Sequence, residues 1–316
     1  MDTAAFEPRE KVEVNVRTLL EAGVHFGHQT ARWNPAMAPF IYGVRNGIHI
    51  ISLPRTVQCW NRARQAVVDI VAQGGNVLFV GTKKQAQEAV QMEASRCGAY
   101  FVSKRWLGGM LTNFSTIRRS IDRMKKLEET LAIEEESIKT GGQTKFTKKE
   151  RLNYSREIEK LNFSLGGIRE MTALPQLLFV IDVKREDIAV KEARRLDIPV
   201  VALVDTNCDP KSITYAIPSN DDGSRAVRLF ARAIGEAIAD GKKKYEENVR
   251  AGKIANATPR GRDDNKRSAS NSGAVSAAPV VAPVVAPVAV APEAPAQSAA
   301  ETAPASDAAA TATADK

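Results

Sequence analysis

QLLFVIDVKREDIAVKEARRLDIPVVALVDT, residues 176–206, is the stretch of this 316-residue sequence that decides its fold. Two strand-like segments, 176–183 and 199–206, contain the continuous apolar runs LLFVI and PVVALV and flank a segment with helical spacing at 186–197. Runs that are apolar on every residue are typical of strands buried on both faces. A helix joining two such strands predicts a parallel pair, and NVLFVGT at 76–82 repeats the strand signature.

The same alternation continues outward from this stretch. Short apolar runs at 48–53 and 100–103 predict two more strands, and helical patterns follow from residue 54, from residue 83 and over 222–250. Strands that alternate with helices favour a three-layer α/β domain, in which helices cover both faces of a parallel sheet.

Between residues 107 and 168 the pattern changes to two helices without strands. The apolar residues of the first helix are Phe114, Ile117, Ile121, Met124, Leu127 and Leu131, and those of the second are Tyr154, Ile158, Leu161, Leu165 and Ile168. The second set keeps the four-three spacing of a heptad seam. We therefore expect an antiparallel coiled-coil helical hairpin at 107–168, inserted into a discontinuous α/β domain formed by 1–106 and 169–256.

The C-terminal segment, 257–316, has a different composition. It has no aromatic residue, is rich in Ala, Pro, Ser, Thr and Val, and repeats a short motif with proline at every fourth position. Such a segment cannot bury enough apolar surface to offset the entropy of ordering, so we expect a disordered tail. Its uncharged stretch, 273–292, is interrupted by prolines, which argues against a membrane span. With no signal peptide in the N-terminal sequence, the expected location is the cytoplasm.

Charge points to a polyanionic partner. The chain has 45 Lys and Arg against 37 Asp and Glu, a formal net charge of +8. Residues 22–68 contain no acid but five arginines, with Trp33, Phe40 and Tyr42 interleaved, available either for base stacking or for core packing. A second basic cluster lies at the root of the predicted hairpin. The residues that we expect to contact RNA phosphates are Arg32, Arg45, Lys83, Lys84, Lys104, Arg105, Arg118, Arg119 and Arg123.

The sequence argues against an enzyme. It has no GxGxxG after a strand, no GxxxxGK[ST] and no GxSxG, so the usual nucleotide and hydrolase motifs of α/β domains are missing. No cofactor is required by this interpretation. The three cysteines form no CxxC pair, which excludes a zinc knuckle.

A divalent metal, zinc or magnesium, is one hypothesis for the histidine and acid motifs HFGH (25–28), DTNCDP (205–210) and SNDDGS (219–224). The candidate ligands are His28, Asp205, Asp221 and Asp222. The alternative is a loop that holds one buried histidine, with Asp222 as a helix N-cap and no metal at all.

A family resemblance adds to this interpretation. GVHFGHQTARWNPAMAPFIYGVRNGIHIISL, GTKKQA, RWLGGMLTNF, SLGGI, LLFVIDV, IPVVALVDTNCDP and IPSNDD occur in the order expected of the bacterial second protein of the small ribosomal subunit. The resemblance covers about residues 14–242. It implies a flavodoxin-like or Rossmann-like layer with a protruding coiled coil, and a non-enzymatic ribosomal component that binds neither membrane nor DNA.

The resemblance also implies partners. They are small-subunit ribosomal RNA at the junction of head and body, neighbouring ribosomal proteins, and the large first small-subunit protein that captures messenger RNA. The four possible metal residues fall in matching motifs, and so do these basic residues: Arg32, Arg45, Lys83, Lys84, Arg105, Arg118 and Arg119. The alternative hypothesis is a protein-only adaptor that docks a partner through the hairpin.

Overall fold

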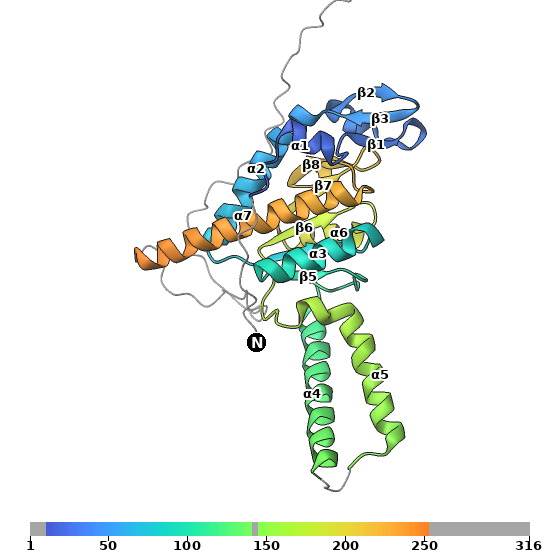
Figure 1. The fold of residues 1–316 in the computed structure, drawn as a ribbon, viewed down its shortest axis with the longest axis vertical. Helices are drawn as coiled ribbons and strands as arrows, with labels where there is room; N and C mark the ends of the chain where they lie inside the picture. Colours follow the sequence, from blue (N-terminus) through green and yellow to red (C-terminus); the bar gives the residue numbers. More distant parts are fainter. Residues whose placement is uncertain (1–10, 141–144, 253–316) are drawn as a thin grey trace, which may run out of the picture. The chain divides into compact units, whose positions relative to one another are not determined.

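The computed structural model describes residues 11–140 and 145–252 and contains a five-stranded parallel sheet (Figure 1). The strands lie in the order β5-β4-β6-β7-β8. Their bounds are Val77–Val80 for β4, Tyr100–Val102 for β5, Leu177–Ile181 for β6, Val200–Val204 for β7 and Tyr215–Pro218 for β8. The predicted α/β fold is confirmed. The predicted tail at 257–316 lies outside the described residues.

Alternate residues of the buried strands feed two separate cores. In β6, Phe179 packs against the helices of one face while Leu178 and Val180 pack against the other face. The first face is covered by α2 (Leu53–Ala72), α3 (Lys84–Cys97) and α7 (Ser224–Arg250), and α7 packs along both other helices. The second face is covered by α6 (Asp187–Arg195) and by the residues that lead into the hairpin. The three layers follow from apolar side chains on both faces of each strand.

The hairpin consists of α4 (Phe114–Lys139) and α5 (Lys148–Leu165), followed by the short helix η3 (Gly166–Ile168). Figure 1 shows both long helices extending beyond the sheet. The predicted stripe of α4 is buried where it meets the body and α5, at Ile117, Ile121 and Met124. A capping box between Thr147 and Glu150 fixes the start of α5. The boundaries of the hairpin at 107–168 and of the α/β domain at 1–106 and 169–256 stay a prediction.

One carboxylate anchors the root of this hairpin. Glu192 of α6 is 8% exposed, and its Oε1 accepts hydrogen bonds from Trp106 Nε1 (3.1 Å) and the Gly109 amide (2.7 Å). Its Oε2 accepts from the amides of Leu111 (2.9 Å) and Thr112 (3.1 Å). The loop that opens the hairpin is therefore tied to the second face of the sheet.

A separate three-stranded antiparallel sheet corrects two sequence predictions. It consists of β1 (Phe26–Gln29), β2 (Ile41–Arg45) and β3 (Ile48–Ile51), in the order β1-β3-β2. The run at 48–53 was expected in the parallel sheet, and the HFGH motif was expected in a loop. Both expectations are wrong, because the chain reverses at Asn46 and Gly47, whose φ angles of 51° and 72° suit a tight hairpin turn.

The small sheet packs at the carboxyl end of β7. The backbone amide of His28 donates to Thr206 Oγ1 at 2.8 Å, and that of Asn34 donates to the Thr206 carbonyl at 2.8 Å. Gly27 is required here, because a Cβ would lie 2.6 Å from Thr206 Cγ2. The remaining described helices are α1 (Val16–Glu21), η1 (Thr30–Arg32), η2 (Pro35–Phe40) and η4 (Pro210–Ser212).

The small sheet and the hairpin approach opposite edges of the parallel sheet. Val24, just before β1, bonds through its carbonyl to Asn220, which follows the edge strand β8. The hairpin returns through η3, which packs against the other edge strand, β5. The two basic clusters predicted from sequence are thus held on one body but at different edges of it (Figure 1).

Candidate nucleic-acid interface

The root of the hairpin carries five of the predicted RNA-contact residues, and all are exposed: Lys104, Arg105, Arg118, Arg119 and Arg123. Within the described residues, Arg105 and Arg119 have no ion-pair partner. Arg118 donates to the Thr172 carbonyl at 3.2 Å, and Arg123 Nε lies 2.7 Å from Glu157 of α5. Arg105 and Arg119 are therefore the cations most available for a phosphate.

The second basic surface is formed by the small sheet. Arg32 ends η1 and Arg45 ends β2, and both are exposed without an ion-pair partner in the part of the chain that the structure describes. The aromatics of this region divide between the two roles left open by the sequence. Tyr42 is 83% exposed, whereas Phe40 is partly buried against the core of the second face. Tyr42 is thus available for stacking and Phe40 is not.

Lys83 and Lys84 likewise differ in their exposure to solvent. Lys84 is exposed at the first turn of α3. The Lys83 ammonium lies 2.8 Å from Asp221, 2.7 Å from Asp222 and 3.4 Å from Asp182, and its side chain is only 12% exposed. The expectation that Lys83 presents an unneutralised charge to RNA does not hold, because three carboxylates of the protein surround it.

Those carboxylates belong to an acidic cluster at the carboxyl ends of the parallel strands. Asp182 follows β6, Asp205 follows β7 and Asp221 follows β8, so the order of the strands brings them together. His28 of β1 reaches the cluster from the small sheet, with Nδ1 3.0 Å from Asp205 Oδ1. The folded structure thus gathers groups that the sequence spacing alone could not place together.

Three of the four predicted metal ligands converge. Ligand atoms of His28, Asp205 and Asp221 all lie within 4.8 Å of one another. Asp221 is 1% exposed and its Oδ2 has no hydrogen-bond partner among the described residues. Asp222 differs: its carboxylate lies on Lys83 and 3.4 Å from His28 Nε2, the other ring nitrogen. Asp222 does not cap α7, whose N-cap is Gly223.

The electrostatics of the cluster follow from burial and crowding. Burial and the neighbouring charges of Asp182 and Asp205 raise the pKa of Asp221 to about 6. The hydrogen bond from Lys83 lowers the pKa of Asp222, and the contact with Asp205 raises the pKa of His28. A nitrogen ligand beside buried carboxylates suits zinc better than magnesium, which prefers oxygen ligands alone.

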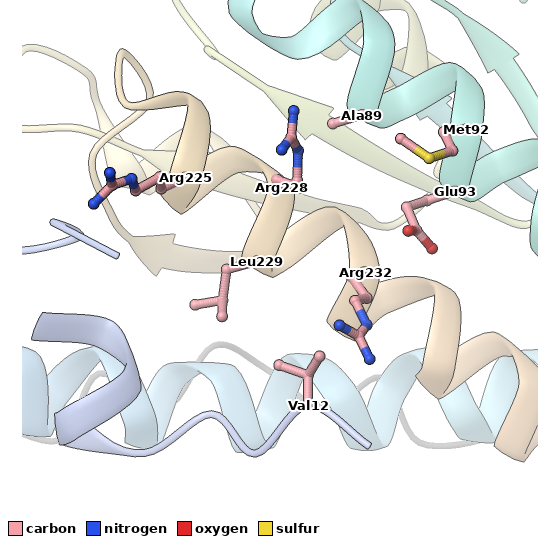
Figure 2. A pocket seen from close by; sticks show the side chains of 8 residues that line it. All are labelled: Val12, Ala89, Met92, Glu93, Arg225, Arg228, Leu229 and Arg232. Carbon is pink, nitrogen blue, oxygen red and sulfur yellow. The ribbon is translucent and has the colours of Figure 1, made fainter. Parts of the chain in front are cut away.

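The sequence predictions missed a row of arginines on α7. Arg225, Arg228 and Arg232 line a shallow groove of about 290 Å³ with Met92 and Leu229 (Figure 2). Arg228 lies 3.6 Å from Glu88, and Arg232 lies 3.3 Å from Glu236. The spacing i, i+3, i+7 is present in the sequence, but the apolar residues of α7 give the stronger periodic signal, and that signal marks the buried face.

Comparison with known proteins decides the family. A family model described as "Ribosomal protein S2" matches residues 19–241. The chain belongs to the ribosomal protein S2 family. Among its relatives is a "Small ribosomal subunit protein uS2" of Xanthobacter autotrophicus, 59% identical over 229 residues, which are 72% of this chain and 67% of the relative. A protein of the same description from Desulfovibrio desulfuricans is 54% identical over 244 residues, 77% of this chain and 91% of the relative.

Membership of the ribosomal protein S2 family also answers the question of catalysis. The family is a structural one, and this chain is a ribosomal protein rather than an enzyme. Within the described residues, no helix is long and apolar enough to cross a membrane. The motifs quoted for the resemblance all lie within the matched residues.

Proposed function

We propose that this protein is a structural component of the cytoplasmic small ribosomal subunit and binds small-subunit ribosomal RNA through phosphate contacts at two edges of its sheet. The observation that carries the proposal is a set of exposed cations on a body whose family is ribosomal. Arg123 pairs with Glu157, and the other cations of the set have no acidic partner among the described residues. The proposed contacts are Arg32, Arg45, Lys84, Lys104, Arg105, Arg118, Arg119 and Arg123. Lys83 is not among the proposed contacts, because three carboxylates of the protein surround its ammonium.

Salt-dependent binding tests the phosphate mechanism. Each phosphate neutralised by the protein releases counterions, so log affinity falls linearly with log salt concentration. Affinity would be measured against folded small-subunit RNA, and against small subunits stripped of this protein, at several salt concentrations. Arg119→Ala should weaken binding and reduce the slope by about 1.

The matched control is Lys243→Ala. Lys243 is exposed near the end of α7, lies on neither basic surface, and its removal changes the net charge by the same amount. It should leave both affinity and slope close to those of the unmodified protein. A slope near zero for the unmodified protein, or equal effects of the two variants, would contradict the proposal.

We further propose that the protein lies at the junction of head and body and recruits the large first small-subunit protein. Exposed apolar side chains on the outer half of the hairpin support a protein contact there: Ile133 is 65% exposed, Ile138 40% and Leu152 51%. This observation also favours the adaptor hypothesis, and the two roles are compatible on different parts of the molecule.

Substitution on the outer hairpin separates the two roles. Ile133→Ser should reduce retention of the large first protein on reconstituted small subunits while leaving the salt slope of RNA binding unchanged. Unchanged retention would remove this part of the hairpin from the protein contact.

We also propose that His28, Asp205 and Asp221 hold a divalent ion, zinc in preference to magnesium. The unpartnered and buried Asp221 Oδ2 supports this, because a buried carboxylate oxygen without a partner is costly. Zinc should raise the midpoint of thermal unfolding in the unmodified protein and should fail to do so in Asp221→Asn. Equal responses of the two proteins, or no response to zinc, would refute the site.

A further inference from the structure

A groove of about 470 Å³ lies where the last turns of α5 meet the end of β5. Ser103 and Lys104, which follow β5, form one side of it. Asn162 and Phe163 of α5 form the other side. Its volume is in the range of pockets that hold small planar ligands.

Phe163 is the unusual residue of this groove. It is 59% exposed and lies off the helical seam, whose residues Leu161 and Leu165 pack against the core of the second face. The ring pairs with no other aromatic ring in the described part of the chain. An aromatic face left open beside a pocket is a surface on which a planar group can stack.

Glycines give the groove its floor. A Cβ on Gly167 would lie 2.1 Å from the carbonyl oxygen of Phe101, and one on Gly166 would lie 2.5 Å from Asn162 Oδ1. Because neither glycine has a side chain, the hairpin approaches β5 closely and the space beside Phe163 stays open.

The polar groups around the ring match a nucleotide. Lys104 at the rim is exposed and hydrogen-bonded to Gln87 through its ammonium (3.0 Å), which leaves donors for a phosphate. The amide of Asn162 offers a donor and an acceptor to a base edge, and the Glu159 carboxylate accepts from an exocyclic amine. Polar side chains outnumber apolar ones in the lining, which favours a base over an apolar peptide.

We propose that this groove binds one unpaired nucleobase of the small-subunit RNA, stacked on Phe163 and carrying an exocyclic amine. The inference rests on the proposed RNA-binding function and deepens it, because it adds a contact of a different kind beside the cations of the hairpin root. Stacking on an aromatic side chain is how proteins commonly hold single-stranded bases.

The test uses the difference between stacking and charge. Phe163→Ala should lower affinity for folded small-subunit RNA by about 5- to 100-fold and leave the salt slope unchanged, because no ion is released by a stacked base. Phe163→Tyr keeps the ring and should bind like the unmodified protein. Thermal unfolding of each variant shows that the fold is retained.

Phe163→Leu distinguishes stacking from simple apolar contact. A base requires the aromatic face, so the leucine variant should lose affinity as the alanine variant does. Binding of Phe163→Leu at the original affinity would overturn the proposal, and so would an unchanged affinity of Phe163→Ala. In either case, a reduced slope in Arg119→Ala would show that the phosphate mechanism itself survives.

Discussion

Glu192 shows how much one buried carboxylate can organise. Its two oxygens receive four protein N–H groups and the Thr112 hydroxyl (3.2 Å), all from the loop that opens the hairpin. Burial alone would favour the neutral acid, but hydrogen bonds from Thr112 and Leu111 outweigh it and lower the pKa of Glu192. The charged form is therefore the one that holds the loop.

Glu192→Gln should destabilise the protein by about 2–4 kcal/mol, because an amide has a single acceptor oxygen and leaves buried donors without partners. Urea unfolding measures the loss, and amide exchange should accelerate at Gly109 and Leu111 first. The control is Glu129→Gln on the exposed surface of α4, which should change stability by less than about 0.5 kcal/mol. Equal effects would show that the Glu192 contacts contribute little.

Acid should loosen the same loop. A carboxylate whose pKa is lowered by folding contributes stability above its ordinary pKa of about 4.3, and that contribution is lost as pH falls through the lowered value. Exchange of the Leu111 amide should therefore rise, relative to the core amide of Phe179, as the solution is taken below about pH 4. In Glu192→Gln this pH dependence should disappear, and its persistence would point to another acid.

The residue scale is also where sequence reasoning reached its limit. The parallel order of the strands predicts that Asp182, Asp205 and Asp221 share one edge, since each follows a strand. It does not predict that the Lys83 side chain points toward these carboxylates rather than toward solvent. The rotamer depends on neighbouring charges that only the folded chain brings together. For the same reason the sequence offered no signal for Glu192, an acid with helical neighbours of ordinary type.

At the scale of elements, periodicity predicted the hairpin and failed on the small sheet. The heptad spacing of α5 extends over several turns, so the signal accumulates. The run at 48–53 predicted the strand that is β3 but placed it in the wrong sheet. The strands β1 and β2 have four and five residues, and their partly buried faces give no continuous apolar run. The Asn46–Gly47 pair was the usable signal, because this dipeptide marks a tight turn between strands.

The contact between η3 and β5 gives a prediction for the hairpin as an element. Gly167→Ala places a methyl group against the backbone carbonyl of Phe101, where neither side can move freely, and should destabilise the protein by about 1–3 kcal/mol. Gly108→Ala is the control, since nothing lies within 4 Å of the added carbon. Thermal unfolding compares the two, and equal midpoints would mean that the hairpin tolerates displacement at its return.

For the whole molecule, the two basic surfaces should act independently. They meet opposite edges of a five-stranded sheet, and four strand spacings correspond to roughly 19 Å. Effects of substitutions this far apart usually add within about 0.5 kcal/mol. The affinity losses of Arg45→Ala and Arg119→Ala should therefore add on a logarithmic scale in the double variant. A double variant no weaker than either single one would show that a single surface carries the binding.

The length of the hairpin gives the Glu192 anchor a mechanical meaning. The 26 residues of α4 correspond to a rod of roughly 39 Å, so each degree of tilt at its base displaces the far end by roughly 0.7 Å. A small rotation at the base of α4 thus becomes a large displacement of its far end. The five hydrogen bonds to the Glu192 carboxylate restrain this base, where stiffness has the greatest effect on the position of the far end.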